Sequence, residues 1–503
     1  MISYNNLKYL ISFFLCGIAS GLLLPPFFLI PLGFIIFPII FFLITKSNFK
    51  KNNKIKHFLF GIIYGLGFGL ITLIWINQPF LLDDNTKKIS FLAYLLVFYI
   101  SIYYGFAFLI ISFFKKNFSK LILIPTTFVI CEILREEILY GFPWVTFALT
   151  YSFNIYTLNL VYYFGTYGLS FLTIFIFLIP VSFFYLSSKN NHNYLFKYNL
   201  YLFFGCFLPL LILLIFYRFN TDTFNENRKN ISFSINQLNI SYEDKNNTEL
   251  YNSRLNKISK IIKEGNKNSI FVFSENDFPF LITQNNIATY FQKILEENQS
   301  IIIGGIRKQN DKFFNSLYNI SKNNSNYFDK KILVPFGEFL PFRNYLEKLN
   351  NIVGNVDFSP GINERKLKLN KSFMFLPVIC YEIIFFNDLL NKNNQNIPII
   401  VNLTNDFWFG SFSGPYQHFY LSRIRSAELN KYIIRVSNNG VSVIFDNKGK
   451  ILESIELNKN GQKNISLNMP KDLNNLHNYH FIIYIFLIIM IGLAILIDLK
   501  KNE

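Results

Sequence analysis

Long apolar segments are the feature of this sequence that most limits how the chain folds. A helix needs roughly 20 apolar residues to cross the hydrocarbon core of a bilayer. Hydrophobic residues make up 51% of the chain, and eight apolar segments predict a polytopic α-helical membrane domain with about eight transmembrane helices. These segments lie at 8–24, 26–45, 57–77, 89–114, 119–135, 157–186, 197–217 and 480–498.

Lysine residues cluster in alternate connections between the predicted spans. They follow the second, fourth, sixth and last spans, at Lys46, Lys50, Lys51, Lys54, Lys56, Lys115, Lys116, Lys120, Lys189, Lys197, Lys500 and Lys501. Because Lys and Arg mark cytoplasmic loops, both termini are predicted inside, and the long segment before the last span outside. An error at the Pro25-Pro26 junction, or at the fifth span ending in Arg135-Glu136-Glu137, would invert this topology.

The formal net charge of +17 follows largely from these loops and from Lys/Asn-rich stretches such as 321–326. No nucleic-acid motif accompanies it, so no nucleic-acid partner is expected. Attraction to anionic lipid head groups is a secondary consequence.

The outer segment is long enough for one sizeable domain. We predict a membrane domain with seven spans at 1–218, an extracytoplasmic catalytic domain at 219–472, and a last span with a short cytoplasmic tail at 473–503. Strands are expected at Ile231–Ile240, Ser269–Ser274, Ser300–Arg307, Phe313–Ile320, Phe373–Ile379, Ile397–Leu403 and Val441–Phe445, and helices at Thr248–Lys263, Asn286–Glu297 and Tyr416–Leu429. The alternation indicates an α/β domain, although Pro377 argues mildly against a central strand there.

Cys380 is the candidate nucleophile. It follows an apolar strand and precedes a predicted amphipathic helix at 382–390, so the helix dipole is expected to favour its thiolate. The alternative is a small buried apolar residue, as most free cysteines are. Cys16, Cys131 and Cys206 fall in predicted spans, so no disulfide framework is expected, and the histidines show no metal-ligand spacing.

Two further segments supply a carboxylate and an ammonium group. Glu275 ends an apolar run, and Lys330 precedes a Pro/Gly loop that carries Glu338. A carboxylate, an ammonium group and a thiol are the parts of a covalent acyl-transfer site. Each group taken alone is more often simply solvated at a strand end.

Three segments of this chain resemble the Glu-Lys-Cys signature of the nitrilase superfamily. They are Ser274-Glu275, Lys330 with Leu333-Val-Pro-Phe-Gly-Glu338, and Ile379-Cys380-Tyr381-Glu382. Other segments are similar to the apolipoprotein N-acyltransferase family: Gly141-Phe-Pro-Trp144, Thr404-Asn-Asp-Phe-Trp-Phe-Gly410, Gly414-Pro-Tyr-Gln-His418 and Ser437-Asn-Asn-Gly440. The resemblance therefore runs along nearly the whole chain.

The resemblance implies a four-layer α-β-β-α sandwich and a transfer in two steps. A phospholipid sn-1 acyl chain would pass to Cys380 as a thioester, then to the α-amino group of the diacylglyceryl-cysteine of an apolipoprotein. Glu275 would be the general base and Lys330 the oxyanion partner, with no cofactor and no metal. The place implied is the bacterial inner (cytoplasmic) membrane, with the catalytic domain on the periplasmic side.

Other residues have supporting roles by the same resemblance. Glu338 would support the lysine or the thioester, while Tyr381 and Glu382 would shape the pocket; the alternatives are packing for Tyr381 and a helix-terminal charge for Glu382. Trp408, Phe409 and Trp144 are candidate lipid-binding aromatics, and Trp144 is equally well explained as an interfacial anchor. The family tends to carry a tryptophan shortly after Ile240, where this chain has Ser241-Tyr242-Glu-Asp-Lys-Asn246.

Two rival functions remain open from the sequence. A membrane-tethered nitrilase-type amidohydrolase would use the same three residues but let water discharge the thioester. A transporter or lipid-binding scaffold would place ionisable groups within its spans, where few beyond Glu132 occur.

Overall fold

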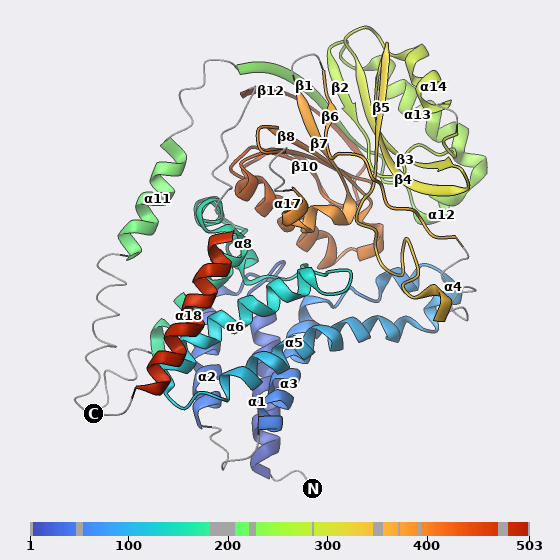
Figure 1. Ribbon diagram of the computed structural model, residues 1–503. Coiled ribbons are helices and arrows are strands. Elements are labelled where there is room, and N and C mark those ends of the chain that lie inside the picture. The colour runs from blue at the N-terminus through green and yellow to red at the C-terminus, as the bar shows by residue number, and fades with distance from the viewer. Residues whose placement is uncertain are drawn as a thin grey trace. The chain divides into compact units, whose positions relative to one another are not determined.

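The computed structural model describes residues 4–46, 54–181, 207–220, 228–283, 286–345, 356–370, 373–389, 394–470 and 481–500. The chain forms two compact units (Figure 1). We call Met1–Asn77, Ser90–Thr223 and Leu476–Glu503 the helical unit, and Gln78–Ile89 with Phe224–Asn475 the sandwich unit. The domain boundaries that we predict at 218/219 and 472/473 remain predictions.

The helical unit has one apolar helix in each predicted span. These are α1 (Tyr4–Gly21), α2 (Gly33–Lys46), α3 (Lys54–Thr72), α5 (Leu95–Ile111), α6 (Asn117–Glu137), α8 (Val161–Phe177), α11 (Leu208–Asn220) and α18 (Phe481–Leu499). Five of the described stretches are long and apolar enough to cross a membrane: Lys54–Thr72, Ser90–Ile111, Asn117–Glu137, Val161–Val181 and Phe481–Leu499. Leu7–Gly21, Ile30–Lys46 and Leu208–Phe219 are shorter apolar helices. Residues 182–186, 197–206 and 480 of the predicted spans lie outside the described residues.

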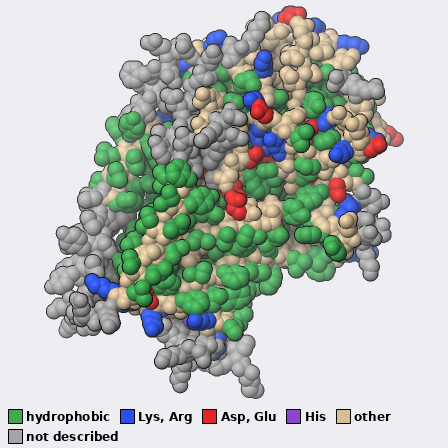
Figure 2. Space-filling model, viewed as in Figure 1, with side chains coloured by type: hydrophobic (Ala, Val, Ile, Leu, Met, Phe, Trp, Pro, Cys, Tyr) green, Lys and Arg blue, Asp and Glu red, His purple; other side chains and the backbone are tan. Residues whose placement is uncertain are grey.

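Apolar side chains face outward from the helical unit. Ile488 and Leu496 of α18 are 68% and 66% exposed, and Figure 2 shows hydrophobic side chains gathered over these helices. Inside the unit, glycines allow close helix packing: a Cβ at Gly61 of α3 would lie 2.2 Å from the carbonyl oxygen of Tyr104 on α5. Exposed apolar side chains with small residues at helix contacts are typical of a membrane domain.

The sandwich unit is built on two six-stranded sheets. The first, in the order β12-β1-β2-β3-β4-β5, comprises β1 (Arg228–Gln237), β2 (Ser269–Val272), β3 (Ser300–Gln309), β4 (Lys312–Ser321), β5 (Asn324–Asp329) and β12 (Gly461–Pro470). The second, in the order β11-β10-β9-β8-β7-β6, comprises β6 (Leu367–Lys368), β7 (Met374–Ile379), β8 (Ile399–Thr404), β9 (Tyr432–Ser437), β10 (Ser442–Phe445) and β11 (Ile451–Ile455). Neighbouring strands β1, β2 and β3 run parallel, as do β7, β8 and β9.

Alternating side chains place the two sheets face to face. In β2, Ile270 and Val272 join the apolar core shared with strands of the second sheet, whereas Phe271 joins a separate core beneath helices α13 (Tyr251–Glu264) and α14 (Asn286–Ile294). This alternation is the period of two that a strand imposes. Helix α17 (Gly414–Leu429) packs on β9 of the second sheet, and Figure 1 shows α17 beside the strands of that sheet. The four-layer α-β-β-α sandwich is therefore confirmed.

Pro377 does lie inside β7, and the surroundings explain why it is tolerated. Strand β8 pairs with β7 from Phe375 to Ile379, but β6 pairs only with Met374 and Phe375. The Pro377 carbonyl accepts a hydrogen bond from Arg365 Nη1 at 2.8 Å. Because N–H and C=O of one strand residue point to the same side, the missing N–H would have faced Arg365 rather than a strand.

The amphipathic helix predicted at 382–390 is wrong. The chain instead forms a short 3₁₀ turn, η10 (Cys380–Ile384), followed by the short helix α16 (Phe386–Leu389). Every side chain of η10 is buried, so there is no solvent-facing side for an amphipathic helix to present.

Candidate active site

The predicted general base, oxyanion partner and nucleophile follow the ends of strands from both sheets. Glu275 lies just beyond β2, Lys330 follows β5, and Cys380 follows β7. Lys330 Nζ lies 3.9 Å from Glu275 Oε1, and the Cys380 thiol is near enough to interact electrostatically with both. All three side chains are buried. The sandwich fold therefore brings these sequence-distant groups together.

Lys330 is held between two carboxylates. Its Nζ lies 2.9 Å from each carboxylate oxygen of Glu338, and its backbone N–H donates to the Asn315 carbonyl at 2.8 Å. Burial alone would lower the pKa of Lys330, but the neighbouring Glu338 and Glu275 carboxylates raise it overall. Lys330 therefore stays a cation, which suits a group that stabilises negative charge.

Glu275 has one carboxylate oxygen engaged and one that meets no hydrogen-bond partner among the described residues. Oε1 accepts from Asn315 Nδ2 at 2.7 Å, while Oε2 is buried without a partner. Burial raises the pKa of Glu275 and Glu338 raises it further, whereas Lys330 opposes the rise. A carboxylate with a raised pKa and an unengaged oxygen is suited to accept a proton.

Asn315 of β4 is a site residue that the sequence analysis missed. Its Nδ2 also donates to Glu338 Oε1 at 2.8 Å, so one amide bridges both acids. Asn315 sits within a strand of ordinary pattern, Lys312–Ser321, and nothing in its local sequence marks it. Only the strand pairing places it opposite Lys330.

The backbone of Cys380 adopts a conformation that is rare for a side-chain-bearing residue. Its φ of 51° lies in the left-handed region, which is found where the surroundings hold a residue under strain and is common at functional sites. The turn from β7 into η10 resembles the sharp strand-to-turn placement of other nucleophiles. This geometry supports a functional cysteine over a merely buried one.

The expected stabilisation of the Cys380 thiolate by a helix dipole is wrong. Burial raises the pKa of the thiol, and Glu275 and Asp406 add to the rise, although Lys330 and a hydrogen bond with Thr404 oppose it. The five-residue 3₁₀ turn η10 replaces the long helix that would carry such a dipole. The resting group is therefore the thiol, and its reaction needs a base.

Glu382 links the segment at Lys330 to the turn at Cys380 through hydrogen bonds. One oxygen accepts from the backbone N–H of Lys331 at 2.8 Å, and the other from that of Ile379 at 2.8 Å. Arg365 Nη1 and Nη2 each donate to it at 2.9 Å. Lys331 follows Lys330 and Ile379 precedes Cys380, so one carboxylate fixes the distance between them. Tyr381 is buried and packs edge-on against Phe385, with ring centroids 5.1 Å apart.

The aromatic candidates of the sandwich unit lie on η12 (Asp406–Phe409). Trp408 is 39% exposed, and Phe409 packs against His418 with ring centroids 5.4 Å apart. Tyr242 contacts the Trp408 ring at 5.7 Å and the Phe407 ring at 6.1 Å. Tyr242 thus adds an aromatic ring to this loop, near the position where the family tends to have tryptophan.

Trp144 belongs to the helical unit, where it is fully buried. Its ring centroid lies 4.8 Å from that of Trp75 and 6.0 Å from that of Phe142. Its predicted part in lipid binding stays a prediction.

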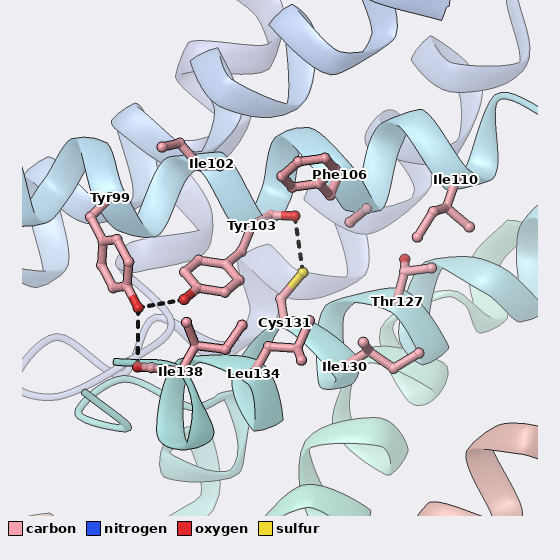
Figure 3. Close-up of a pocket in the computed structure, with 11 residues that line it drawn as sticks. Tyr99, Ile102, Tyr103, Phe106, Ile110, Thr127, Ile130, Cys131, Leu134 and Ile138 are labelled. Carbon is pink, nitrogen blue, oxygen red and sulfur yellow. Dashed lines mark hydrogen bonds between the residues drawn. The ribbon is translucent and has the colours of Figure 1, made fainter. Parts of the chain in front are cut away.

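An apolar cavity of about 350 Å³ lies between α5 and α6 in the helical unit (Figure 3). The polar groups at its wall are paired: the Tyr99 hydroxyl contacts that of Tyr103 and the Ile138 carbonyl, and Cys131 Sγ donates to the Tyr103 carbonyl at 3.2 Å. It is lined by Tyr99, Ile102, Tyr103, Phe106, Ala107, Ile110, Thr127, Ile130, Cys131, Leu134 and Ile138. None of these is a predicted site residue.

Within the described ranges, no group of three or more His, Cys, Asp and Glu side chains is arranged to hold a metal ion. The site combines a carboxylate and a cation 3.9 Å apart with a thiol that interacts electrostatically with both, and these are the groups that covalent acyl chemistry uses.

Known protein families match parts of both units. The family model described as apolipoprotein N-acyltransferase N-terminal domain matches residues 16–179, and the one described as carbon-nitrogen hydrolase matches 269–466. A Rickettsia prowazekii protein named apolipoprotein N-acyltransferase is 31% identical, with 95% of this chain and 96% of the relative aligned. A Rhodopseudomonas palustris protein of the same name is 27% identical, over 91% of this chain and 89% of the relative.

Among solved structures, a Saccharomyces cerevisiae member of branch 10 of the nitrilase superfamily covers 48% of this chain and 90% of its own, at 16% identity and a TM-score of 0.36.

Proposed function

Because the chain belongs to the apolipoprotein N-acyltransferase family, we propose that Glu275, Lys330 and Cys380 carry its N-acyltransferase reaction. The acyl donor is a phospholipid, which gives up its sn-1 chain. The acceptor is the α-amino group of the diacylglyceryl-cysteine at the N-terminus of an apolipoprotein. This assignment of residues rests on one observation: Lys330 and Glu275 form a buried ion pair, and the Cys380 thiol interacts electrostatically with both.

In the first half-reaction Glu275 takes the proton from Cys380 Sγ as the sulfur attacks the ester carbonyl. The unengaged Oε2 of Glu275 is the oxygen available for that proton. The Lys330 ammonium stabilises the oxyanion of the tetrahedral intermediate. When the C–O bond breaks, the proton on Glu275 passes to the departing alkoxide, which leaves as lysophospholipid, and the acyl group remains on sulfur as a thioester.

In the second half-reaction the neutral amine attacks the thioester carbonyl. Glu275 takes a proton from the attacking nitrogen and returns it to the sulfur as the C–S bond breaks, so an amide and the free thiol are formed. Glu338 keeps Lys330 in place through the contacts at 2.9 Å. Glu382 acts as a positioning residue for both Lys330 and Cys380, and Tyr381 forms part of the pocket wall.

The alternative is an amidohydrolase in which water discharges the thioester with the same three residues. The match of 16–179 to an acyltransferase N-terminal domain favours acyl transfer, because a hydrolase needs no such membrane half. Burial of the site also favours transfer, since it limits the access of water to the thioester.

The apolar helices and the family place the chain in a bacterial membrane. We propose that this is the inner membrane, with the sandwich unit on the periplasmic side, because the lysine-rich connections mark the opposite side as cytoplasmic. Trp408 and Phe409 would hold the acyl chains at the bilayer surface, and Trp144 would help to guide lipid within the helical unit.

The test follows the lysophospholipid and free fatty acid released by the purified protein in phospholipid micelles. The acceptor is a peptide with an N-terminal diacylglyceryl-cysteine, and the matched control is the same peptide with its amino group acetylated. We expect repeated turnover with the free amine only, and none with Cys380→Ala. Free fatty acid released equally with both peptides would contradict the proposal and establish a hydrolase.

A further inference from the structure

A second buried network lies directly behind the nucleophile, and the reaction above does not use it. Asp406 Oδ1 accepts from Thr404 Oγ1 at 3.0 Å and lies 2.8 Å from His418 Nδ1. The other nitrogen of the same ring, His418 Nε2, lies 3.3 Å from the carbonyl oxygen of Cys380. All of these side chains are buried, with Asp406 and His418 at 0% exposure.

The ring of His418 is fixed from several elements. Arg435 of β9 places Nη2 2.6 Å from Asp406 Oδ2 and 3.1 Å from His418 Nδ1, and Phe409 packs edge-on against the ring. Burial and the Arg435 cation lower the pKa of His418, while Asp406 opposes the change. The ring therefore has one orientation, in which Nε2 faces Cys380.

Nε2 must carry a proton for its contact with Cys380 to be a hydrogen bond, because the carbonyl oxygen can only accept. Two protonation states meet this condition. In one, the imidazolium donates to both Asp406 and Cys380; in the other, the neutral ring donates from Nε2 while Nδ1 accepts from Arg435 Nη2. In both states the donor to Cys380 is Nε2.

The contact reaches the strained part of the nucleophile. Cys380 has φ of 51°, a strained conformation that persists only where the surroundings hold it. Its carbonyl belongs to the planar peptide that also carries the Tyr381 N–H, so one hydrogen bond to that oxygen fixes the orientation of both groups. On the other side, Glu382 holds the Ile379 N–H. The thiol is thus held from before and after along the chain.

We propose that His418, oriented by Asp406, is a positioning residue that holds the Cys380 backbone so that its thiol faces Glu275 and Lys330. This rests on the function proposed above, since it concerns the rate at which Cys380 takes the acyl group. Asp406 begins the same short η12 that carries Trp408 and Phe409. The network therefore also links the nucleophile to the aromatic loop.

The experiment compares two substitutions of similar size. A glutamine at position 418 places its amide nitrogen near the place of Nε2 and keeps a donor for the Cys380 carbonyl. An asparagine places its amide near Nδ1, so it keeps the contact with Asp406 but does not reach Cys380. His418→Gln and His418→Asn therefore separate the two contacts of the ring, and His418→Ala removes both.

The readout is the single-turnover rate at which full-length protein gains an acyl group on Cys380 from phosphatidylethanolamine with a deuterated sn-1 chain, measured by intact mass. We expect His418→Asn and His418→Ala to slow this step by about 10²-fold, as a misplaced reacting group does. We expect His418→Gln to stay within about tenfold of wild type, the size of one weakened hydrogen bond. The lipid concentration for half-maximal rate should be the same in the glutamine and asparagine variants, because both lose the ring that packs against Phe409.

Equal losses in the glutamine and asparagine variants, with equal thermal stability, would overturn the proposal, and so would a wild-type rate in His418→Asn. If wild type itself gains no acyl group on Cys380, the proposed function fails instead. The two failures are therefore distinguishable in one series.

Discussion

The two units place apolar and charged side chains in opposite ways. In the helical unit large apolar residues face outward, as Leu499 does with 73% exposure, because the surrounding medium is hydrocarbon. In the sandwich unit the apolar residues lie between sheets, and charged Glu275, Lys330 and Glu382 are buried among them. Hydropathy locates the first unit directly. The proposed chemistry lies where charge is buried at a cost, and hydropathy does not show which charged side chains are buried.

Substitutions in the two units should therefore have effects of different size. Removing one member of a buried charged group leaves its partners unpaired, which is far more costly than losing an exposed ion pair. A change at a helix contact of the helical unit should act through packing alone.

The largest expected effect is that of Lys330→Met. It removes the cation between Glu275 and Glu338, so we expect the rate of acyl transfer to fall by at least about 10²–10³-fold and the free energy of unfolding by about 3–5 kcal/mol. Single-turnover kinetics and urea unfolding in detergent measure the two. Lys308→Met is the control, because Lys308 pairs at the surface with Asp311, whose side chain is 96% exposed. A Lys330→Met protein with more than a tenth of the wild-type rate would contradict the role of this cation.

Glu382→Gln should be next in size. It breaks the buried pair with Arg365 at 2.9 Å and weakens the link between Lys331 and Ile379. We expect a loss of about 3 kcal/mol in the free energy of unfolding, measured by urea denaturation. Glu264→Gln, in an exposed pair with Lys260, is the matched control and should cost less than about 0.5 kcal/mol. Similar losses in both variants would remove the distinction between buried and exposed charge.

Asn315→Ala should shift a pH dependence. The Asn315 amide donates to Glu275 and favours its charged form, so its removal should raise the already raised pKa of that carboxyl. The acyl-transfer rate needs ionised Glu275, so the acid limb of its pH profile should then move to higher pH. A pH–rate profile of single-turnover acylation measures this. An acid limb that stays in place or moves to lower pH would contradict the assignment of Glu275 as base.

Asn315→Ala should also change how the stability of the protein depends on pH. A carboxyl whose pKa is raised by folding stabilises the native state below its unfolded pKa, and this contribution is lost as pH rises through the folded pKa. The deficit of Asn315→Ala in melting temperature should therefore grow as pH rises above the ordinary pKa of a glutamate carboxyl. A deficit in melting temperature that becomes smaller as pH rises would contradict this expectation.

The smallest effects should come from the helical unit. A methyl group at Gly61 would lie 2.2 Å from the Tyr104 carbonyl oxygen, whereas one at Gly492 meets nothing within 4 Å. Gly61→Ala should therefore lower stability by about 1–3 kcal/mol, and Gly492→Ala should be neutral or raise it by up to about 1 kcal/mol. Thermal unfolding in detergent measures both. A reversed order would mean that α3 and α5 do not pack as described.

The sequence predicted the parts of the fold that depend on local patterns. Every predicted strand of the sandwich unit is present, and so are α13, α14 and α17. Strand β9 was not predicted. It has a buried charged residue, Arg435, at its centre, and Asp406 and Asn402 from neighbouring elements form hydrogen bonds with that side chain. Edge strand β12 was not predicted either: half of its side chains are exposed, and its apolar alternation is confined to Ile465, Leu467 and Met469.

The site was predictable where it follows strand ends and not where it depends on pairing. Glu275 and Cys380 follow apolar runs that predict buried strands, and Lys330 precedes a Pro/Gly loop that carries Glu338. Asn315 and Arg365 reach the site from strand pairing and a loop, and their local sequences carry no such mark. The predicted thiolate failed because the sequence shows neither the burial of Cys380 nor the shortness of η10.

The most direct test of the central claim is the intact mass of wild-type protein after incubation with phospholipid that carries a deuterated sn-1 chain, before and after addition of a diacylglyceryl peptide. We predict one labelled acyl group on Cys380, labile to hydroxylamine, that disappears as the peptide amine gains it. An unchanged protein mass while the peptide is acylated, or a label on any other residue, would contradict the account.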